Sequence, residues 1–400
     1  MLNFNQTIYD AVSGDRDLLN FLLLHGFEQL KNPKMLEVLG KTMTLGKACD
    51  MRGIDREKLN TDYEAYRKKL EGGEDITLRQ KHEAGAATLK IRGILPCPIR
   101  VPLLELFDSF IKQQGAEDTI DYDLRSANLG LDWMEDEVRR AESTEDLPDV
   151  FMSAGFKLFF DKELIGKFVE EGAFRYDAMR LHDRYRQPDC MLEDPQKNYY
   201  VTGTVPAVFI INHAVLGDRP VPQSWEDLMQ PIYYNDVAVP MGDLDLFNAI
   251  LISLYDRYGM DAVRKLGRNF ATDLHPSQMV KKTTPAISIS PYFFACMIRG
   301  GQGMSYVWPT DGAVASPIFT IIKKSALDRL QPFLEFLTSE ETTAVFSANG
   351  KFPCTDPKAK DILPPETKLL FPSWDLLNGE DITSLLDRCE AVFYEGVREE

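Results

Sequence analysis

From residue 88 to the end of the chain, short apolar stretches alternate with segments of helical periodicity. The first pair is a strand expected at 89–95 and a helix expected to run through Leu104, Phe107 and Ile111. Apolar runs of about four to eight residues are typical of buried strands, whereas apolar residues three or four positions apart are typical of helices. The same alternation recurs at 149–152, 206–211, 237–239, 286–290 and 312–322. Strands that alternate with helices predict an α/β fold.

The first 70 residues follow a different pattern, that of short helices with clear start and stop signals. Asn32 is a favoured N-cap, Pro33 suits the first helical position, and Gly40 follows the last apolar residue of that helix. Helices this short are marginal alone and must pack on one another. We therefore expect a small all-α domain over residues 1–70. Because the composition then turns polar, we expect a linker over residues 71–87.

The chain is acidic, with 45 Lys and Arg against 62 Asp and Glu and a formal net charge of −17. Such a charge repels a phosphate backbone, and no cluster of five basic residues offsets it, so we expect no nucleic-acid partner. No apolar stretch approaches the roughly 20 residues that span a bilayer, so we expect no membrane span. Residues 1–17 show no basic segment followed by an apolar one, which predicts a cytoplasmic location.

Sequence signatures of catalysis and metal binding are missing. The six cysteines include no Cys-x-x-Cys, and the five histidines include no pair four positions apart. We therefore expect reduced single thiols, with neither a disulfide framework nor a metal site. The sequence also has no G-x-G-x-x-G after a strand, no Walker loop and no G-x-S-x-G elbow. These observations favour a protein without catalysis and without a cofactor.

Four turns join an expected strand to an expected helix and carry small or polar residues. At the start of a helix the backbone N–H groups are unpaired, and with the helix dipole they suit an anion or a carboxylate. Turns at the carboxyl ends of strands in an open α/β sheet converge on a binding cleft. The four turns are Pro96-Cys97-Pro98, Ser153-Ala154-Gly155, Met241-Gly242-Asp243 and Ser288-Ile289-Ser290-Pro291-Tyr292. We predict that they hold a ligand.

Several segments, in this order, resemble the type 2 solute-binding proteins of ABC transporters, in the branch that contains ferric-iron, polyamine and phosphonate binders. The resemblance covers residues 88–400. The segments that carry it are Leu147-Pro148-Asp149-Val150-Phe151, Ser224-Trp225-Glu226-Asp227-Leu228, Tyr306-Val307-Trp308-Pro309-Thr310-Asp311-Gly312 and Phe333-Leu334-Glu335-Phe336-Leu337.

The resemblance implies a two-lobed type 2 periplasmic-binding-protein fold, with two crossing hinge strands and the ligand between the lobes. It places the crossing strands near Tyr199–Ala207 and Tyr306–Ala313. Lobe 1 is then expected over 88–202 and 311–400, and lobe 2 over 203–310. Closure of such lobes is a hinge motion that ligand contacts favour. Gly203 is either a hinge position or the glycine of a β-bulge.

A phosphonate or phosphate-ester ligand is the first of three possibilities. It would use the backbone N–H groups of the four turns, together with side-chain hydroxyls and a cation. The hydroxyls would come from Ser153, Ser288 and Ser290, and the cation from Arg100, which follows the first turn.

The other two ligands are a polyamine and ferric iron. A polyamine needs acidic and aromatic side chains, which Asp243, Asp245, Tyr292 and Trp308 supply. Iron-binding members of the resembling family carry adjacent tyrosines, where this chain has Tyr292-Phe293-Phe294. Because one phenolate is missing there, we place iron below an organic or oxyanion ligand.

The N-terminal segment resembles a second family, a small helical domain of unknown function that is sometimes joined to redox or hybrid-cluster proteins. The segments that carry this resemblance are Asn32-Pro33-Lys34-Met35 and Met43-Thr44-Leu45-Gly46-Lys47-Ala48. Redox versions of that domain carry paired cysteines, whereas Cys49 stands alone here. We therefore prefer a docking or structural role.

The leading hypothesis is non-catalytic binding of a small polar or anionic solute in a cleft between two lobes, for uptake, sensing or delivery. The expected partners are that solute and either an ABC transporter or a protein that docks on the N-terminal helices. One alternative is a cytosolic enzyme on the same scaffold with Cys97 as the nucleophile, because a helix N-terminus lowers the pKa of a thiol. Another is an interaction adaptor whose cleft is vestigial.

Overall fold

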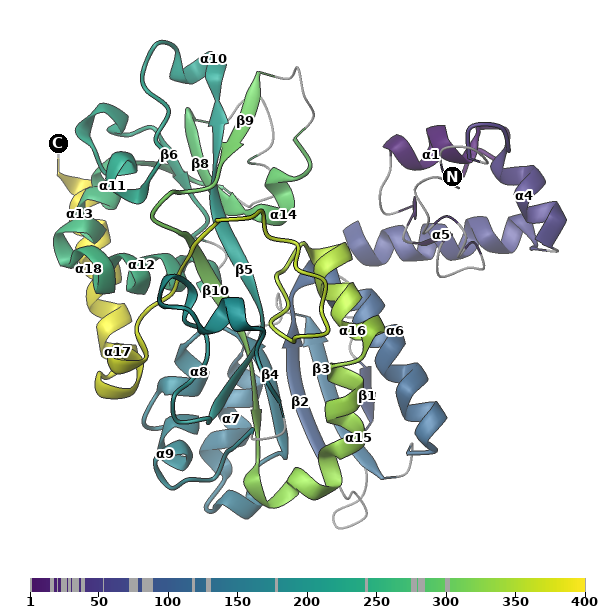
Figure 1. Ribbon diagram of the computed structural model, residues 1–400, viewed down its shortest axis with the longest axis horizontal. Helices are drawn as coiled ribbons and strands as arrows, with labels where there is room; N and C mark the ends of the chain where they lie inside the picture. Colours follow the sequence, from purple (N-terminus) through teal and green to yellow (C-terminus); the bar gives the residue numbers. More distant parts are fainter. Residues whose placement is uncertain are drawn as a thin grey trace. The chain divides into compact units, whose positions relative to one another are not determined.

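The chain divides into two compact units, Met1–Ile76 and Thr77–Glu400. Both are drawn in the computed structural model of Figure 1. The structure describes residues 1–400 except for 1, 15–17, 20, 23–26, 28–29, 31–35, 37–39, 53, 72–77, 81–88, 117–118, 127–130, 177–178, 242–243, 275–278, 280–284, 299–302 and 400.

The first unit is helical in its described part, which confirms the all-α expectation. Its helices are α1 (Ile8–Gly14), α4 (Leu45–Arg52) and α5 (Arg56–Glu71). Leu45 and Cys49 of α4 are buried together with Leu59 and Tyr63 of α5, so this unit has an apolar core of its own. Most of the helix expected to begin at Pro33 lies outside the described residues.

The second unit is built on one sheet, in which the strands follow the order β1-β3-β2-β4-β10-β5-β8-β6-β7, with β11 beside β10 and β9 beside β5. The strands are β1 (Leu78–Gln80), β2 (Leu89–Leu95), β3 (Ile120–Ser126), β4 (Val150–Ala154), β5 (Tyr199–Asn212), β6 (Val237–Val239), β7 (Phe270–Asp273), β8 (Ile287–Pro291), β9 (Met304–Val307), β10 (Ala313–Ile322) and β11 (Leu369–Leu370).

Helices pack around this sheet, as the alternating sequence pattern predicts. They are α6 (Cys97–Gln114), α7 (Asp132–Arg140), α8 (Lys157–Phe160), α9 (Ile165–Glu170), α10 (His213–Leu216), α11 (Trp225–Leu228), α12 (Leu244–Tyr258), α13 (Met260–Asn269), α14 (Tyr292–Ala295), α15 (Leu327–Leu337), α16 (Glu340–Ala344), α17 (Trp374–Gly379) and α18 (Ile382–Arg398). Short 3-10 turns and one π-helical segment, η9 (Val345–Gly350), connect some of them. Among the described residues, none of the helices has the length and apolar character needed to cross a membrane.

Two long antiparallel strands, β5 and β10, join the two halves of the sheet (Figure 1). β10 pairs with β4 on one side, and β5 pairs with β8 on the other. We call the part with β1 to β4 the β4 lobe and the part with β6 to β8 the β8 lobe. This arrangement confirms the expected two-lobed type 2 fold. The first crossing strand lies where we expected it.

The second crossing strand was misplaced in the sequence prediction. We expected it near Tyr306–Ala313, but the strand that pairs with both β4 and β5 is β10, which begins at Ala313. Tyr306 belongs to β9, a separate strand that pairs only with the far end of β5 among the described contacts. The sequence signal was ambiguous because two β-rich segments flank the turn at Gly312, whose φ is +115°.

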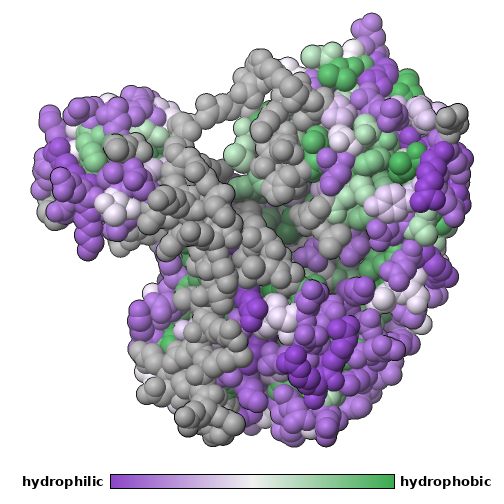
Figure 2. All heavy atoms as spheres, turned by 180° about the vertical axis from the view of Figure 1, so that it is seen from behind, coloured by the Kyte–Doolittle hydropathy of each residue, from purple (hydrophilic) through white to green (hydrophobic). Residues whose placement is uncertain are grey.

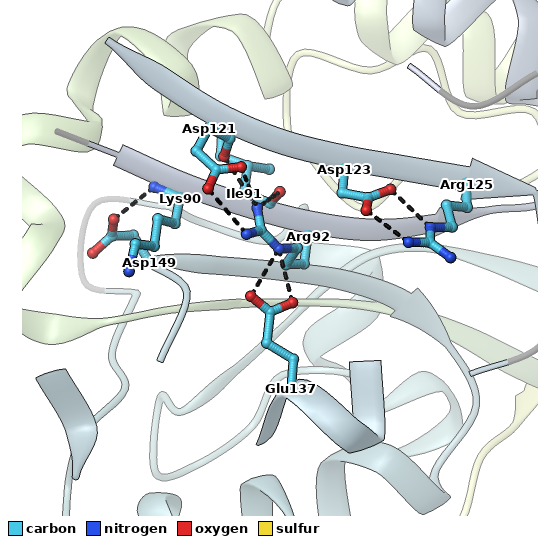
Figure 3. Close-up of polar contacts among 8 residues, drawn as sticks. All are labelled: Lys90, Ile91, Arg92, Asp121, Asp123, Arg125, Glu137 and Asp149. Carbon is cyan, nitrogen blue, oxygen red and sulfur yellow. Dashed lines mark hydrogen bonds and ion pairs between the residues drawn. The ribbon is translucent and has the colours of Figure 1, made fainter. Parts of the chain in front are cut away.

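A buried charge network holds α7 against the β4 lobe (Figure 3). Arg92 of β2 lies between the carboxylates of Asp121 on β3 and Glu137 on α7, with N–O distances of 3.0 and 2.8 Å. Asp123 and Arg125, further along β3, form a second pair at 2.8 Å. Each of these charged groups has a partner inside the cluster, so the network fixes packing and leaves no charge directed at a ligand.

Candidate functional site

The turn after β4, one of the predicted ligand turns, approaches the first turn of α12, which belongs to the other lobe. Gly155 has a φ of +94°, and its N–H donates to the carbonyl of Pro317 at 3.4 Å. A Cβ added at Gly155 would lie 2.4 Å from Oδ1 of Asp245. The position therefore requires glycine both for its backbone conformation and for the approach of α12.

Ser153 and Ala154 complete this turn and are buried at the end of β4. The hydroxyl of Ser153 donates to the carbonyl of Ala154 at 3.1 Å, so its proton is used within the strand. Of the third predicted turn, Met241-Gly242-Asp243, Gly242 and Asp243 fall outside the described residues.

Two hydroxyls of β8 are buried without a hydrogen-bond partner among the described residues. They belong to Ser288 and Ser290, both of which were predicted as ligand residues. Ser288 pairs with Ile210 of β5, and Ser290 pairs with Val208. Because paired residues of neighbouring strands point to the same side of a sheet, both hydroxyls lie on one face of the β8 lobe.

An aromatic cluster lies on the same face. Tyr306 of β9 also pairs with Ile210, so Ser288, Ile210 and Tyr306 form one row across three strands. The ring of Tyr292, at the start of α14, lies 5.7 Å from that of Tyr306 and 5.3 Å from that of Trp308. Tyr306 remains 41% exposed. The two buried hydroxyls therefore share their face with three aromatic rings.

The phenol of Tyr292 is held in its neutral form. Burial raises its pKa most, and hydrogen bonding with Cys296 and Tyr306 raises it further. A ferric ligand must be a phenolate, so this environment opposes iron binding at Tyr292. Tyr306 supplies the second phenol that the sequence around Tyr292 lacks, yet among the described residues no group of three His, Cys, Asp or Glu side chains could complete a metal site.

The crossing strands are irregular at Gly203. Ile318 of β10 pairs with Gly203, but the next residue, Phe319, pairs with Val201, so Thr202 is an extra residue in β5. This is the bulge alternative of the sequence analysis. A Cβ at Gly203 would lie 3.2 Å from both a ring carbon of Phe346 and the carbonyl oxygen of Pro353, and a bridge joins Gly203 to Cys354.

Thr204, next to this bulge, carries a third buried hydroxyl without a hydrogen-bond partner in the described part of the chain. Its backbone N–H donates to the carbonyl of Pro353 at 3.0 Å, which fixes the strand but leaves the side chain unused.

The first predicted turn forms the start of α6. Pro96 is its N-cap and contributes no side-chain hydrogen bond, whereas its carbonyl accepts the N–H groups of Ile99 and Arg100 at 3.2 and 3.1 Å. Arg100 is buried in the first helical turn. A Cβ added at Gly350 would lie 2.6 Å from Cγ2 of Ile99, so η9 covers this end of α6. The side chain of Cys97 lies outside the described part.

The structure thus joins the predicted residues into two groups. One is Gly155 with Asp245, both hydrogen-bonded to β10, and the other is Ser288, Ser290 and Tyr292. Tyr306 was missed as a site residue, because only the register of β9 on β5 brings it to Ser288. Exposed large apolar and aromatic side chains also concentrate in the β8 lobe. They are Val215, Ile232, Tyr234, Met297 and Tyr306. Figure 2 shows green areas in its upper part, although tyrosine is not green on that scale.

Two cavities lie away from both groups. The larger, of about 860 Å³, lies on the β8 lobe between α11 and α13 and is lined by residues that include Tyr234, Tyr258 and Lys265. The smaller, of about 240 Å³, lies on the β4 lobe near the start of β5. Neither includes a residue of the predicted turns.

The family can be assigned on sequence. Residues 145–379, more than half of the chain, match the family model described as bacterial extracellular solute-binding protein. The chain belongs to this family. This match confirms the resemblance found in the sequence. The matched residues include the two crossing strands and β8. Residues 2–59 match a domain of unknown function, DUF1858, which confirms the second resemblance. No curated protein matches the chain in sequence.

Solved structures share the two-lobed fold of this solute-binding protein. A substrate-binding protein of an ABC transporter from Agrobacterium tumefaciens superposes with a TM-score of 0.54 at 14% identity, covering 81% of this chain and 98% of its own. A Trichodesmium protein (IdiA, FutA) in complex with iron and citrate gives 0.54 at 16%, covering 76% and 98%. The protein AfuA from Actinobacillus pleuropneumoniae, with fructose-6-phosphate bound, gives 0.50 at 16%, covering 75% and 96%.

Proposed function

We propose that the Thr77–Glu400 unit binds a small polar or anionic solute between its two lobes, without converting it. The observation that carries the proposal is the pair of buried hydroxyls on Ser288 and Ser290. An unpartnered polar group in a protein interior costs about 1–3 kcal/mol, so such groups are normally hydrogen-bonded. A solute with hydrogen-bonding groups, held at the end of β8, would satisfy both hydroxyls.

Groups on the β4 lobe and on the β8 lobe favour an oxyanion such as a phosphate ester over a polyamine. Arg100 places a positive charge in the first turn of α6, and the N-terminus of an 18-residue helix adds a partial positive charge. Asp245, the described carboxylate of the polyamine alternative, lies against Gly155. The exposed edge of Tyr306 suits a ring of the solute, and the sugar phosphate bound to AfuA is a ligand of this chemical class.

Closure around the solute would bend β5 and β10 at the bulge opposite Ile318. A hinge there needs few residues to change conformation, because β5 and β10 are the strands that join the lobe sheets in the described structure. The solute would shift the lobes toward the closed state by contacting both of them.

The identity of the solute can be tested on freshly purified full-length protein. Native mass spectrometry should detect a small molecule that leaves on denaturation, and that molecule should raise the melting temperature of the emptied protein. Inorganic phosphate, fructose-6-phosphate, spermidine and ferric citrate serve as defined probes of the ligand classes. A visible absorption band after ferric citrate is added would instead favour iron bound by a tyrosine.

Substitutions of Ser288 and Ser290 test whether the two hydroxyls bind the solute. We expect Ser288→Ala and Ser290→Ala to weaken binding of the solute about tenfold each, as the loss of one hydrogen bond of about 1.4 kcal/mol implies. Ser253→Ala is the matched control, because Ser253 is also buried and unpartnered in the described structure but lies in the middle of α12. Equal affinity in all three variants and the wild type would contradict the proposed site.

The biological setting belongs to the same proposal. Binding of this kind serves uptake, sensing or delivery, and an ABC transporter or a protein docked on the N-terminal helices would be the partner. The cytoplasmic location stays a prediction, which fractionation of cells that produce the native chain would test. The enzyme alternative with Cys97 as nucleophile also stays a prediction. Loss of a solute-converting activity in Cys97→Ser would support it.

A further inference from the structure

A second, smaller cavity opens at the start of β5, whereas Ser288 and Ser290 pair with the last part of that strand. It has a volume of about 240 Å³ and is lined by Tyr176, Met179, Arg180, Leu181, Arg186, Glu193 and Lys197. Tyr199, the first residue of β5, precedes Val208, the partner of Ser290, by nine residues, which is about 30 Å along an extended strand. The cavity is therefore separate from Ser288 and Ser290.

Three cations and one carboxylate line this cavity. Glu193 accepts hydrogen bonds from Arg186, at 3.0 Å, and from Lys197. These hydrogen bonds outweigh the effect of burial and lower the pKa of Glu193, so it stays ionised. A single carboxylate shared between two cations leaves an excess of positive charge among the lining residues. This is unusual in a chain with a net charge of −17.

Arg180 carries part of that excess. Its guanidinium makes no hydrogen bond or ion pair with the residues that the structure describes, whereas its backbone is fixed. Its carbonyl accepts the hydroxyl of Tyr200 at 3.4 Å, and its neighbours Met179 and Leu181 are buried. The exposed side chain thus extends from a hydrogen-bonded backbone at the edge of the cavity, with its donors available.

A hydrogen-bonded turn holds the backbone of Lys197 in place. Its φ is +62°, a conformation that costs a residue with a side chain about 1–2 kcal/mol. The carboxylate of Asp194 accepts the N–H groups of Gln196, Asn198 and Tyr199 at 2.7–3.0 Å and so stabilises this turn. The ammonium group lies 5.4 Å from the centre of the Tyr176 ring. Backbone strain at a fixed cation is a common property of binding sites.

Two further acids lie beside the cavity, but neither lines it. The carboxylate of Asp194 is fully buried and accepts the three backbone N–H groups; it attracts Lys197 but has no oxygen left for the other two cations. Asp183 lies 3.4 Å from Arg186, but its side chain is 88% exposed, so water screens that pair strongly.

We propose that this cavity on the β4 lobe is an anion site that binds inorganic phosphate or the phosphate group of a small ester, held by Arg180, Arg186 and Lys197. The volume is below the roughly 300–1,000 Å³ of pockets for drug-sized ligands, which fits a small anion. Arginine guanidinium groups bind phosphate oxygens in a bidentate manner, and lysine adds a point charge. The site is independent of the solute proposed between the lobes.

The methyl group of Met179 is a local reporter for the test. Full-length protein labelled with [methyl-13C]methionine is titrated with inorganic phosphate at low ionic strength, where screening is weak. The Met179 signal is assigned with Met179→Leu. We expect this signal to shift and saturate with phosphate, and to stay in place when chloride is added at the same ionic strength. A Met179 signal that phosphate leaves unmoved, or that chloride moves equally, would overturn the proposal.

Variants test which cations are responsible. Arg180→Gln should raise the dissociation constant for phosphate at least tenfold without lowering the melting temperature, because its guanidinium supports no described contact. Lys197→Gln should weaken binding to a similar degree, and Arg139→Gln on the exposed face of α7 should leave it unchanged. Unchanged affinity in Arg180→Gln would refute the site even if Lys197→Gln failed to fold. Ser290→Ala should not alter the Met179 shift, which separates this cavity from binding between the lobes.

Discussion

Gly155 allows the β4 lobe to approach Asp245 of the β8 lobe more closely than any residue with a side chain could. We expect Gly155→Ala to destabilise the protein by about 1–3 kcal/mol, because the added Cβ would overlap Oδ1 of Asp245 and the φ of +94° disfavours alanine. Urea unfolding measures the loss. Gly172→Ala is the control, since its φ of +75° is also positive but no atom lies within 4 Å of its added Cβ.

The double variant Gly155→Ala with Asp245→Ala separates the two causes. Removing the carboxylate should recover the steric part of the loss and leave the backbone part, as in Gly172→Ala. If Gly155→Ala and Gly172→Ala cost the same, the contact between the lobes has no steric consequence at Gly155.

At the same scale, the sequence identified Ser288, Ser290 and Tyr292 as a group, because a strand that ends in hydroxyl residues before a helix is a local pattern. Tyr306 could not be found in this way. Its place beside Ser288 follows from the pairing of both residues with Ile210, which depends on strand register between segments far apart in the chain. The contact of Asp245 with Gly155 is non-local for the same reason.

Among the elements, the packing of α18 on α13 depends on two glycines. A Cβ at Gly267 would lie 2.1 Å from the carbonyl oxygen of Phe393, and one at Gly396 would lie 2.1 Å from that of Arg264. Either alanine would force the helices apart, so we expect Gly267→Ala and Gly396→Ala each to cost about 1–3 kcal/mol in urea unfolding. Gly379→Ala at the end of α17, with open space around its Cβ, should be close to neutral. A loss at Gly379 as large as at Gly267 would contradict the packing argument.

A fall in pH should destabilise both ends of α18. At its start, hydrogen bonds from the backbone and hydroxyl of Ser384 lower the pKa of Asp381, and at its end Arg268 and then Arg264 lower the pKa of Glu399. A lowered folded-state pKa stabilises the protein above the unfolded-state value, and this stabilisation is lost as the pH falls through the folded-state value. The window therefore lies below about pH 4.5, the ordinary range of these carboxyls.

Variants of Asp381 and Glu399, melted at two pH values, test whether these two charges stabilise the helix ends. Asp381→Ala and Glu399→Gln should melt at lower temperature than the wild type at pH 6, and the difference should be smaller at pH 3, because the fall in pH toward the lowered folded-state pKa values begins to protonate the wild-type carboxyls. Circular dichroism melts at the two pH values measure it. A deficit of equal size at both pH values would mean that the charges are not responsible.

The sequence predicted most elements of the second unit because buried strands and amphipathic helices have distinct apolar periods. It failed at the second crossing strand for a physical reason. The segments 304–307 and 313–322 both form strands beside β5, and only the hydrogen bonds to β4 distinguish the one that crosses. Those hydrogen bonds join segments far apart in the chain, so the local spacing of apolar residues does not predict them.

On the scale of the whole molecule, the two-lobed fold accounts for why the ligand turns come from different parts of the sequence. β4, α6 and β8 are far apart in the chain, yet β5 and β10 bring their ends toward the crossing region. The same two strands are the described connections between the lobe sheets, so changes at the Gly203 bulge are expected to affect both the position of the lobes and the binding of the solute.

The division between Ile76 and Thr77 predicts that the solute-binding unit is independent. The core of the first unit, with Leu45, Cys49, Leu59 and Tyr63, is built from its own helices. A fragment of residues 77–400 should therefore melt cooperatively, and the molecule that co-purifies with the full chain should raise the melting temperature of both by the same amount. A fragment that melts cooperatively but no longer responds would show that the N-terminal helices contribute to binding. A fragment without a cooperative transition would show that the two units depend on each other for folding.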